Sequence, residues 1–162
     1  MGLDDYHFVT RWHMEAPVEP VYDLLGEPLR YQEWMKEIWI RVTSVHQGEP
    51  SGLGREDLYE LRGFLPYRLR WTLRCIAIRR PYGFTSLAAG DLEGKGTWSF
   101  QPVPGGTEIT FDWQVALQKP ALRPWALLLR PVFKWNHDWV MEKWKKNLER
   151  ELKRSLKIAP TL

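Results

Sequence analysis

His137 is the residue whose type and position most strongly suggest a chemical role. It stands four residues after Phe133 and four before Met141, in a C-terminal segment where apolar residues recur at helical spacing. A helix there places the imidazole inside an apolar stripe, where it needs a hydrogen-bond partner to offset its desolvation. Three roles fit this position: a structural histidine satisfied by a strand, a polar anchor for a ligand hydroxyl or carbonyl, and a general acid or base.

The tryptophans are the second group that suggests a function, with ten copies in 162 residues. Alternation along the expected strands points three of them inward, and a fourth faces them from the C-terminal helix. Rings in such numbers either pack solidly or line a pocket, and a ring-lined pocket suits flat, apolar ligands. The predicted ligand-binding set is Trp71, Trp98, Trp113, His137, Met141 and Trp144.

Metal and nucleophilic-triad chemistry have no support in the sequence. The histidines lack metal-ligand spacing, Cys75 has no second cysteine, and there is no G-x-S-x-G motif. Segment 90–96 resembles a phosphate loop, but three residues rather than four separate its first two glycines, so we expect a tight β-turn. His137 and Asp138 are neighbours in the expected helix, so their side chains should diverge by about 100° and form no dyad. We therefore expect no metal and no cofactor.

The formal net charge of +3 is a weak hint of a polyanionic partner. Residues 142–157 hold seven basic and three acidic residues, with Glu142–Lys146 and Glu149–Lys153 at i,i+4 spacing. We interpret this stretch as a solvated helix face; the alternative is weak peripheral attraction to anionic lipid or to a polyanion. Nucleic-acid binding by base stacking is disfavoured, because the arginines around Trp71 alternate onto the opposite face of their strand.

The sequence predicts a cytoplasmic protein without an integral membrane segment. Its first residues lack the basic-then-apolar pattern of a secretory signal. Its longest purely apolar run, Trp125–Leu129, is far below the ~20 residues that a membrane-spanning helix needs. A single cysteine cannot form an intramolecular disulfide, so a reducing compartment is allowed. The sequence leaves the oligomeric state open.

Hydrophobic periodicity predicts an α+β chain with two short helices after the first strand and a long C-terminal helix. The first short helix should open at residues 16–17 and end in a left-handed cap at Gly26, and residues 29–34 form the second. Everything after Pro120 is expected to be helical, with a kink or restart at Pro131. The expected strands are residues 6–13, 38–45, 55–62, 67–79, 84–89, 96–101 and 107–117.

Two of these strands have an irregular pattern. In residues 67–79 the inward alternation breaks after Cys75, where Ile76 and Ile78 predict a bulge or a covered apolar patch. In residues 55–62 both parities carry apolar and charged residues, so the face that lines a cavity stays open. The titratable residues left unplaced there are Glu56, Asp57, Tyr59 and Glu60.

This order of elements resembles the helix-grip fold of the START-like (SRPBCC) superfamily. Residues 16–34, Leu65-Pro66-Tyr67 and segment 90–94 carry the resemblance, and residues 133–141 are similar to the final helix of bacterial polyketide cyclase/dehydrase-like proteins. The resemblance covers roughly residues 6–152. It implies a curved antiparallel sheet of about seven strands wrapping the long helix, in a single START-like ligand-binding domain over residues 1–162.

The resemblance also implies a cavity between sheet and helix that takes a small, mostly apolar molecule, such as a lipid-, polyketide- or aromatic-like ligand. The leading hypothesis is binding, with His137 as the polar group. The alternative is a polyketide cyclase/dehydratase-type enzyme that uses the same cavity and one acid/base group. A third hypothesis is an interaction module that uses the basic helix and Ile76/Ile78. A second titratable group near His137 would separate the first two, and the sequence does not place one.

Overall fold

The computed structural model describes residues 5–63 and 67–158. The chain folds in the predicted order of strand, short helices, meander and long helix. The strands are β1 Asp5–Met14, β2 Trp39–His46, β3 Glu56–Arg62, β4 Leu69–Arg79, β5 Gly83–Gly90, β6 Leu92–Val103 and β7 Gly106–Leu117. The helical elements are α1 Val18–Leu25, the short 3-10 turn η1 Pro28–Arg30, α2 Tyr31–Trp34, a second 3-10 turn η2 Arg123–Trp125, and α3 Ala126–Ile158.

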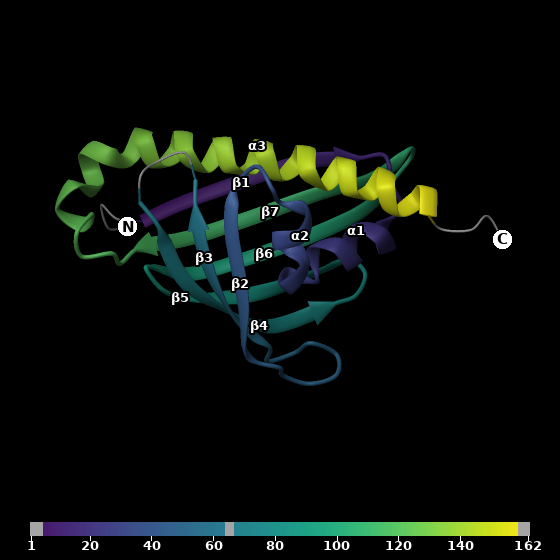
Figure 1. The fold of residues 1–162 in the computed structure, drawn as a ribbon, viewed down its shortest axis with the longest axis horizontal. Coiled ribbons are helices and arrows are strands. Elements are labelled where there is room, and N and C mark those ends of the chain that lie inside the picture. The colour runs from purple at the N-terminus through teal and green to yellow at the C-terminus, as the bar shows by residue number, and fades with distance from the viewer. Residues whose placement is uncertain (1–4, 64–66, 159–162) are drawn as a thin grey trace.

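The strands form one antiparallel sheet of seven, in the order β1-β7-β6-β5-β4-β3-β2. The first strand therefore pairs with the last, and Tyr6 lies opposite Val115 while Trp12 lies opposite Ile109. The sheet is strongly curved: β2 and β3 run across the view in front of β1, β7 and β6 (Figure 1). Its two edges are β1 and β2, and the curvature brings these edges round toward α3. The curved antiparallel sheet of the prediction is confirmed.

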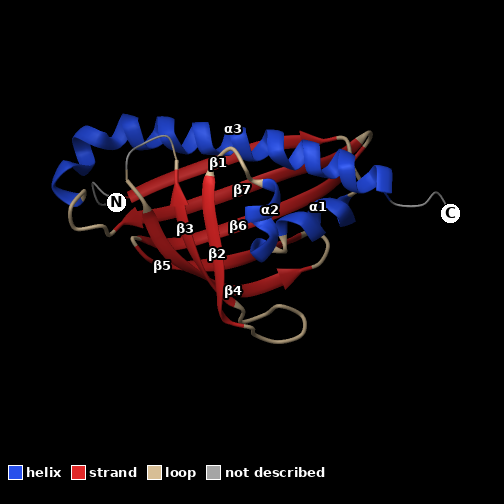
Figure 2. Cartoon of the chain, viewed as in Figure 1, coloured by secondary structure: helices blue, strands red, loops and turns tan. Residues whose placement is uncertain are grey.

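Helix α3 runs for 33 residues along the open side of the sheet (Figure 2). The apolar stripe read from the sequence is its inward face: Val140, Met141 and Leu148 are buried, and Phe133 and Trp144 pack partly buried against the core. Pro131 lies inside α3, and the first turns of the helix bend away from its main axis in Figure 1. The short helices cover the other end of the sheet, where α1 contacts α3, β6 and β7 while α2 contacts α3 and β2.

Two local expectations are wrong. Gly26 ends α1 with φ −81°, in the right-handed region, and its N–H donates to the Tyr22 carbonyl at 2.7 Å without any left-handed cap. The glycine-rich segment 90–96 is a turn only at Asp91, because β6 begins at Leu92 and its ladder to β7 continues through Gly96. A strand rather than a helix follows this turn, so the segment has no helix N-terminus to offer a phosphate.

The bulge expected in β4 is confirmed. The register between β4 and β5 shifts between Cys75 and Ala77, which inserts one extra residue into β4. The shift turns Ile78 toward the concave side of the sheet, while Ile76 stays 42% exposed. The two isoleucines therefore form no common patch.

The basic stretch of α3 is an ion-paired, solvated face. Lys143 lies 3.0 Å and Arg150 3.1 Å from Glu37, so two of its cations share one carboxylate. Lys146 pairs with Glu142 at 3.4 Å as expected, whereas Glu149 lies 4.0 Å from Lys145 rather than pairing with Lys153. Such exposed pairs contribute little stability, but they neutralise much of the charge that suggested a polyanionic partner.

Candidate functional site

A cavity of about 250 Å³ lies between α3 and the concave face of the sheet. Every strand of the sheet contributes to its wall, and α3 contributes one turn after another from Phe133 to Trp144. The wall forms because inward side chains recur at every second residue along the strands and at every third or fourth residue along the helix. The curvature of the sheet then brings these side chains around one space.

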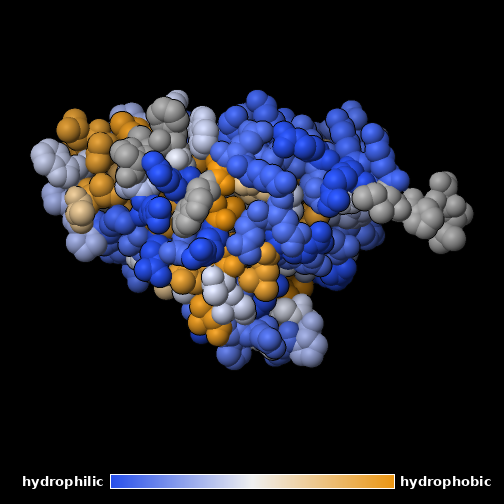
Figure 3. Space-filling view, viewed as in Figure 1, coloured by the Kyte–Doolittle hydropathy of each residue, from blue (hydrophilic) through white to orange (hydrophobic). Residues whose placement is uncertain are grey.

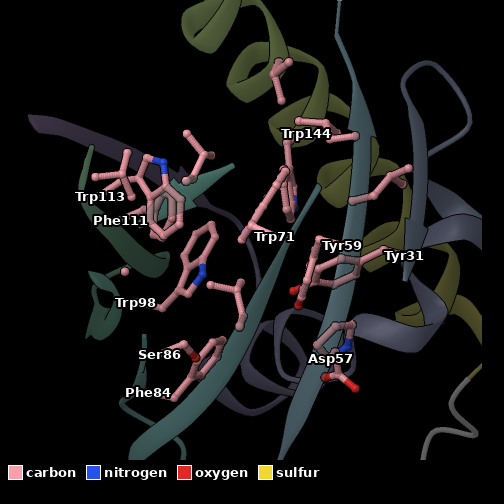
Figure 4. A pocket seen from close by; sticks show the side chains of 18 of the residues that line it. Tyr31, Asp57, Tyr59, Trp71, Phe84, Ser86, Trp98, Phe111, Trp113 and Trp144 are labelled. Carbon is pink, nitrogen blue, oxygen red and sulfur yellow. The ribbon is translucent and has the colours of Figure 1, made fainter. Parts of the chain in front are cut away.

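Aromatic rings make up two sides of the cavity. On one side the Trp98 ring stacks on Phe111, with centroids 4.2 Å apart and an interplanar angle of 19°, and Phe111 continues to Trp113 at 5.6 Å. On the other side Tyr59 stacks on Trp71 at 5.7 Å. Figure 4 shows the two groups of rings facing each other across the cavity. Stacked rings on strands are held by the sheet ladder, so they form a stiff, flat-walled space.

The glycine-rich segment shapes this wall. A Cβ on Gly96 would lie 2.7 Å from Cε3 of Trp113, closer than any side chain can approach. Glycine at this position lets the Trp113 ring lie flat over β6, and Gly96 itself lines the cavity. The spacing that resembled a phosphate loop therefore serves the packing of an indole against a neighbouring strand.

His137 enters the cavity wall from α3, as the sequence predicted. Its ring stacks on Phe8 with centroids 4.0 Å apart and an interplanar angle of 10°, and its side chain is 14% exposed. Nε2 has no hydrogen-bond partner among the described residues. Nδ1 lies 3.5 Å from Oδ1 of Asp138, so the two side chains do approach each other, contrary to the expectation that they diverge. The contact is at the outer limit of a hydrogen bond, because both side chains leave the helix one residue apart and meet only at their tips.

Burial lowers the pKa of His137 below its ordinary 6.5, and the nearby Asp138 carboxylate only partly opposes this effect. The imidazole is therefore neutral in the folded protein at neutral pH, and it resists protonation more than it does in the unfolded chain. Its contribution to stability is fully present above pH 6.5 and is lost as the pH falls from 6.5 toward the lowered folded-state pKa.

We expect His137→Phe to remove this acid sensitivity. In urea unfolding, the wild type should lose stability relative to the variant as the pH falls below 6.5, because only the wild type carries the buried imidazole. Parallel pH profiles for wild type and His137→Phe would contradict the burial of this imidazole.

A buried carboxylate lies on β3, where the sequence left the facing open. The inward residues of this strand are Asp57, Tyr59 and Leu61. The Asp57 side chain is 3% exposed, and its Oδ2 accepts a hydrogen bond from Nε of Arg55 at 2.8 Å. Its Oδ1 has no hydrogen-bond partner in the described part of the chain. Arg55 also donates to the Gly26 carbonyl at 3.3 Å, which ties this pair to the end of α1. Desolvation raises the pKa of Asp57, and the adjacent Arg55 guanidinium partly opposes this rise.

Two buried tyrosines stand beside this pair, and sequence reasoning assigned neither a role. The Tyr31 hydroxyl, from α2, donates to the Leu25 carbonyl, and its ring lies 5.2 Å from Trp144 and 6.5 Å from Tyr59. Burial raises the pKa of both tyrosines, so both remain neutral phenols. Tyr31 lies in a short helix, four residues before Met35, where the apolar pattern is too short to show which side chains face inward. Tyr59 is seen to face inward only once β3 is paired with β4.

All six residues of the predicted ligand-binding set line the cavity, so the structure brings them together. Trp71 and Trp144 keep their indole Nε1 atoms buried without a hydrogen-bond partner among residues 5–63 and 67–158. Within the same residues, no cluster of three or more His, Cys, Asp or Glu side chains is placed to hold a metal ion. None of the described helices has the length and apolar character needed to cross a membrane.

Comparison with known structures gives the same architecture over nearly the whole chain. The Zhui aromatase/cyclase from Streptomyces sp. R1128 superposes with a TM-score of 0.74 at 13% identity, covering 98% of this chain and 99% of that one. The protein TTHA0849 from Thermus thermophilus gives 0.71 at 19% identity, covering 93% and 99%. The di-domain aromatase/cyclase BexL of the BE-7585A biosynthetic pathway gives 0.64 at 15% identity, covering 91% of this chain and 51% of that one.

At these identities the superpositions show a shared fold. Among curated proteins, no sequence matches this chain. The family described as polyketide cyclase / dehydrase and lipid transport matches residues 6–154, which include all seven strands except the first residue of β1 and all but the last turn of α3. The fold is thus the hydrophobic-ligand-binding, helix-grip fold of that family, and the chain belongs to the polyketide cyclase/dehydrase and lipid transport family.

Proposed function

We propose that the protein binds a small, flat, mostly apolar molecule in the cavity between α3 and the sheet. The observation that carries this proposal is a cavity of about 250 Å³ with stacked rings on two facing sides. An apolar cavity of about 150 Å³ is large enough to bind benzene, so this one has room for a larger ring system. Membership of a family described by polyketide chemistry and lipid transport supports an apolar ligand.

The wall chemistry favours aromatic or polyketide-like ligands over featureless hydrocarbons. Flat rings gain from offset stacking and edge contacts with Trp98, Trp71 and Trp144 beyond the burial of their area. His137 and the Arg55–Asp57 pair approach the cavity from different elements, the first from α3 and the second from the beginning of β3 and the residue before it. In this proposal a ligand hydroxyl or carbonyl bonds to His137, whose Nε2 otherwise stays buried without a bond at a cost in free energy.

Paired titrations with 2-naphthol and naphthalene test this proposal. Wild-type protein should bind both, and His137→Phe should weaken 2-naphthol by about 1–3 kcal/mol while leaving naphthalene nearly unchanged, because only the phenol loses a hydrogen bond. Lys145→Ala, on the outer side of α3, is the matched control and should bind both ligands like wild type. If neither ligand binds the wild type, the binding proposal fails; if both weaken equally, His137 acts through packing alone.

One observation favours the cyclase/dehydratase alternative. Asp57 is a buried carboxyl with a raised pKa beside the cavity, and neutral Tyr59 lies one inward position further along β3. Aldol cyclisation needs a base to take an α-proton and an acid to protonate the alkoxide, and loss of water then needs the same two roles. We expect Asp57→Asn to abolish any conversion of a poly-β-ketone thioester analogue to an aromatic product, while Lys145→Ala retains it. Conversion that is equal in Asp57→Asn and wild type would exclude Asp57 from the chemistry.

A further inference from the structure

We infer that the beginning of α3 docks onto an anionic lipid membrane surface. The side chains concerned are those of Trp125, Leu127, Leu128 and Trp135, which we call the α3 entry patch. They are 59%, 61%, 71% and 48% exposed, and Leu128 is the most exposed large apolar side chain among the described residues. Apolar residues gather at this end of the molecule in Figure 3. This inference does not depend on what the cavity binds.

The α3 entry patch differs from ordinary surface apolar residues in its density. Single exposed apolar side chains are normal on a protein surface and need no explanation. Here four large ones fall within residues 125–135, three of them within residues 125–128, although the inward side of the same segment already supplies Ala126 and Phe133 to the interior. The exposed residues are therefore not needed to anchor this part of α3 to the sheet.

The charge around the α3 entry patch is positive. Residues 114–137 contain four basic residues, Lys119, Arg123, Arg130 and Lys134, and no aspartate or glutamate. Lys119 pairs with Asp91 at 3.4 Å and Lys134 with Asp138 at 2.6 Å, so the positive charge of the segment rests mainly on Arg123 and Arg130. Arg130 donates to the backbone carbonyl of Asp5 and lies over the Tyr6 ring, contacts that fix the guanidinium and leave its charge intact. Anionic lipid headgroups attract such a cluster, and the attraction weakens as salt screens it.

The combination of residue types fits a bilayer surface better than a second copy of the chain. Tryptophan prefers the boundary between headgroups and acyl chains, and leucine buries below it. A symmetric dimer through the α3 entry patch would bring Arg123 and Arg130 of one copy near the same arginines of the other, which disfavours association. Trp135 of the patch lies between Phe133 and His137 in the chain, so a docked membrane would lie next to the part of the cavity wall that α3 supplies.

Sedimentation with lipid vesicles tests this inference. Wild-type protein should bind vesicles that contain about one-third phosphatidylglycerol in phosphatidylcholine, bind pure phosphatidylcholine much less, and dissociate as salt is added. Replacing two exposed leucines in Leu127→Glu/Leu128→Glu should weaken binding at least about tenfold, since it removes apolar contact and adds negative charge. The matched control Val45→Glu/Ile76→Glu changes charge equally at two exposed aliphatic residues on β2 and β4, and it should bind like wild type.

Three results would overturn the inference. The first is wild-type protein that does not sediment with anionic vesicles. The second is equal loss of binding in the test and control variants, which would show a response to net charge alone. The third is a wild-type dimer, seen by size-exclusion chromatography, that Leu127→Glu/Leu128→Glu converts to a monomer, because the α3 entry patch would then be covered by a second copy. Circular dichroism of both variants at matched temperature confirms that each remains folded.

Discussion

Trp98→Ala should lower the free energy of unfolding by about 3–5 kcal/mol, a range typical of large aromatic truncations in a core. Trp98 is 7% exposed and sits at the centre of the ring network, 4.2 Å from Phe111, 5.8 Å from Trp12 and 6.1 Å from Trp144. Removing the indole takes away one side of the cavity wall. The neighbouring rings then lose packing contacts, and the hydrogen-bonded sheet cannot move inward to restore them. Urea unfolding monitored by circular dichroism measures the change.

Trp125→Ala is the matched control, since the same truncation at a 59% exposed ring should change stability by less than about 0.5 kcal/mol. The loss of unfolding free energy in Trp98→Phe should fall between those of Trp98→Ala and Trp125→Ala, because the smaller ring still stacks on Phe111. Equal losses at Trp98 and Trp125 would contradict the placement of the Trp98 ring. If Trp98→Ala does not fold, the Trp98→Phe value still separates a central ring from an exposed one.

Arg55→Met should cost about 3 kcal/mol at neutral pH, near the lower end for breaking a buried ion pair, because the guanidinium is partly exposed. The variant leaves the Asp57 carboxylate buried without its cation. Burial already raises the pKa of Asp57 and Arg55 lowers it, so its removal raises the pKa further. When the folded-state pKa of a carboxyl is raised, the folded protein is fully stable only while that carboxyl is protonated. The loss of unfolding free energy in Arg55→Met should therefore be small below the ordinary pKa of 3.8 and should grow as the pH rises through the folded-state pKa.

Two variants isolate the cause. Arg55→Met/Asp57→Leu removes both charges and should recover to within about 1 kcal/mol of wild type, as buried pairs replaced by apolar residues often do. Arg70→Met breaks the 3.1 Å ion pair between Arg70 and Glu60. The Arg70 side chain is 62% exposed, so this change should lower the free energy of unfolding by less than about 1 kcal/mol. A pH-independent loss in Arg55→Met, or a double variant as unstable as the single, would show that the Asp57 charge is not the cause.

The sequence predicted the helix and strand order because its strongest periodic signals lie in the elements that build the cavity. Strand β7 alternates cleanly over Thr107–Leu117, and α3 carries an apolar stripe from Phe133 onward; both sit where that pattern places them. The proposed site residues on these elements, and on β4 and β6, could be predicted because each faces inward by simple alternation. Their placement around one space follows from the curvature of the sheet.

The rest of the site could not be predicted, for physical reasons that differ by residue. Asp57 and Tyr59 lie on a strand whose outer face also carries Leu58, so alternation alone cannot separate the two faces. Arg55 lies just before β3 and reaches Asp57 only through a side-chain contact. Gly96 falls at the boundary between the expected turn and the expected strand, and its packing role could not be predicted because the ring that it accommodates belongs to β7.

A crystal structure of the protein with bound 2-naphthol would show whether the cavity between α3 and the sheet is the ligand-binding site. We expect one ligand between α3 and the sheet, with its rings against Trp98 and Trp71 and its hydroxyl within hydrogen-bond distance of His137. Naphthol found only on the α3 entry patch, with the space between α3 and the sheet closed by side chains, would contradict the claim that this cavity is the binding site.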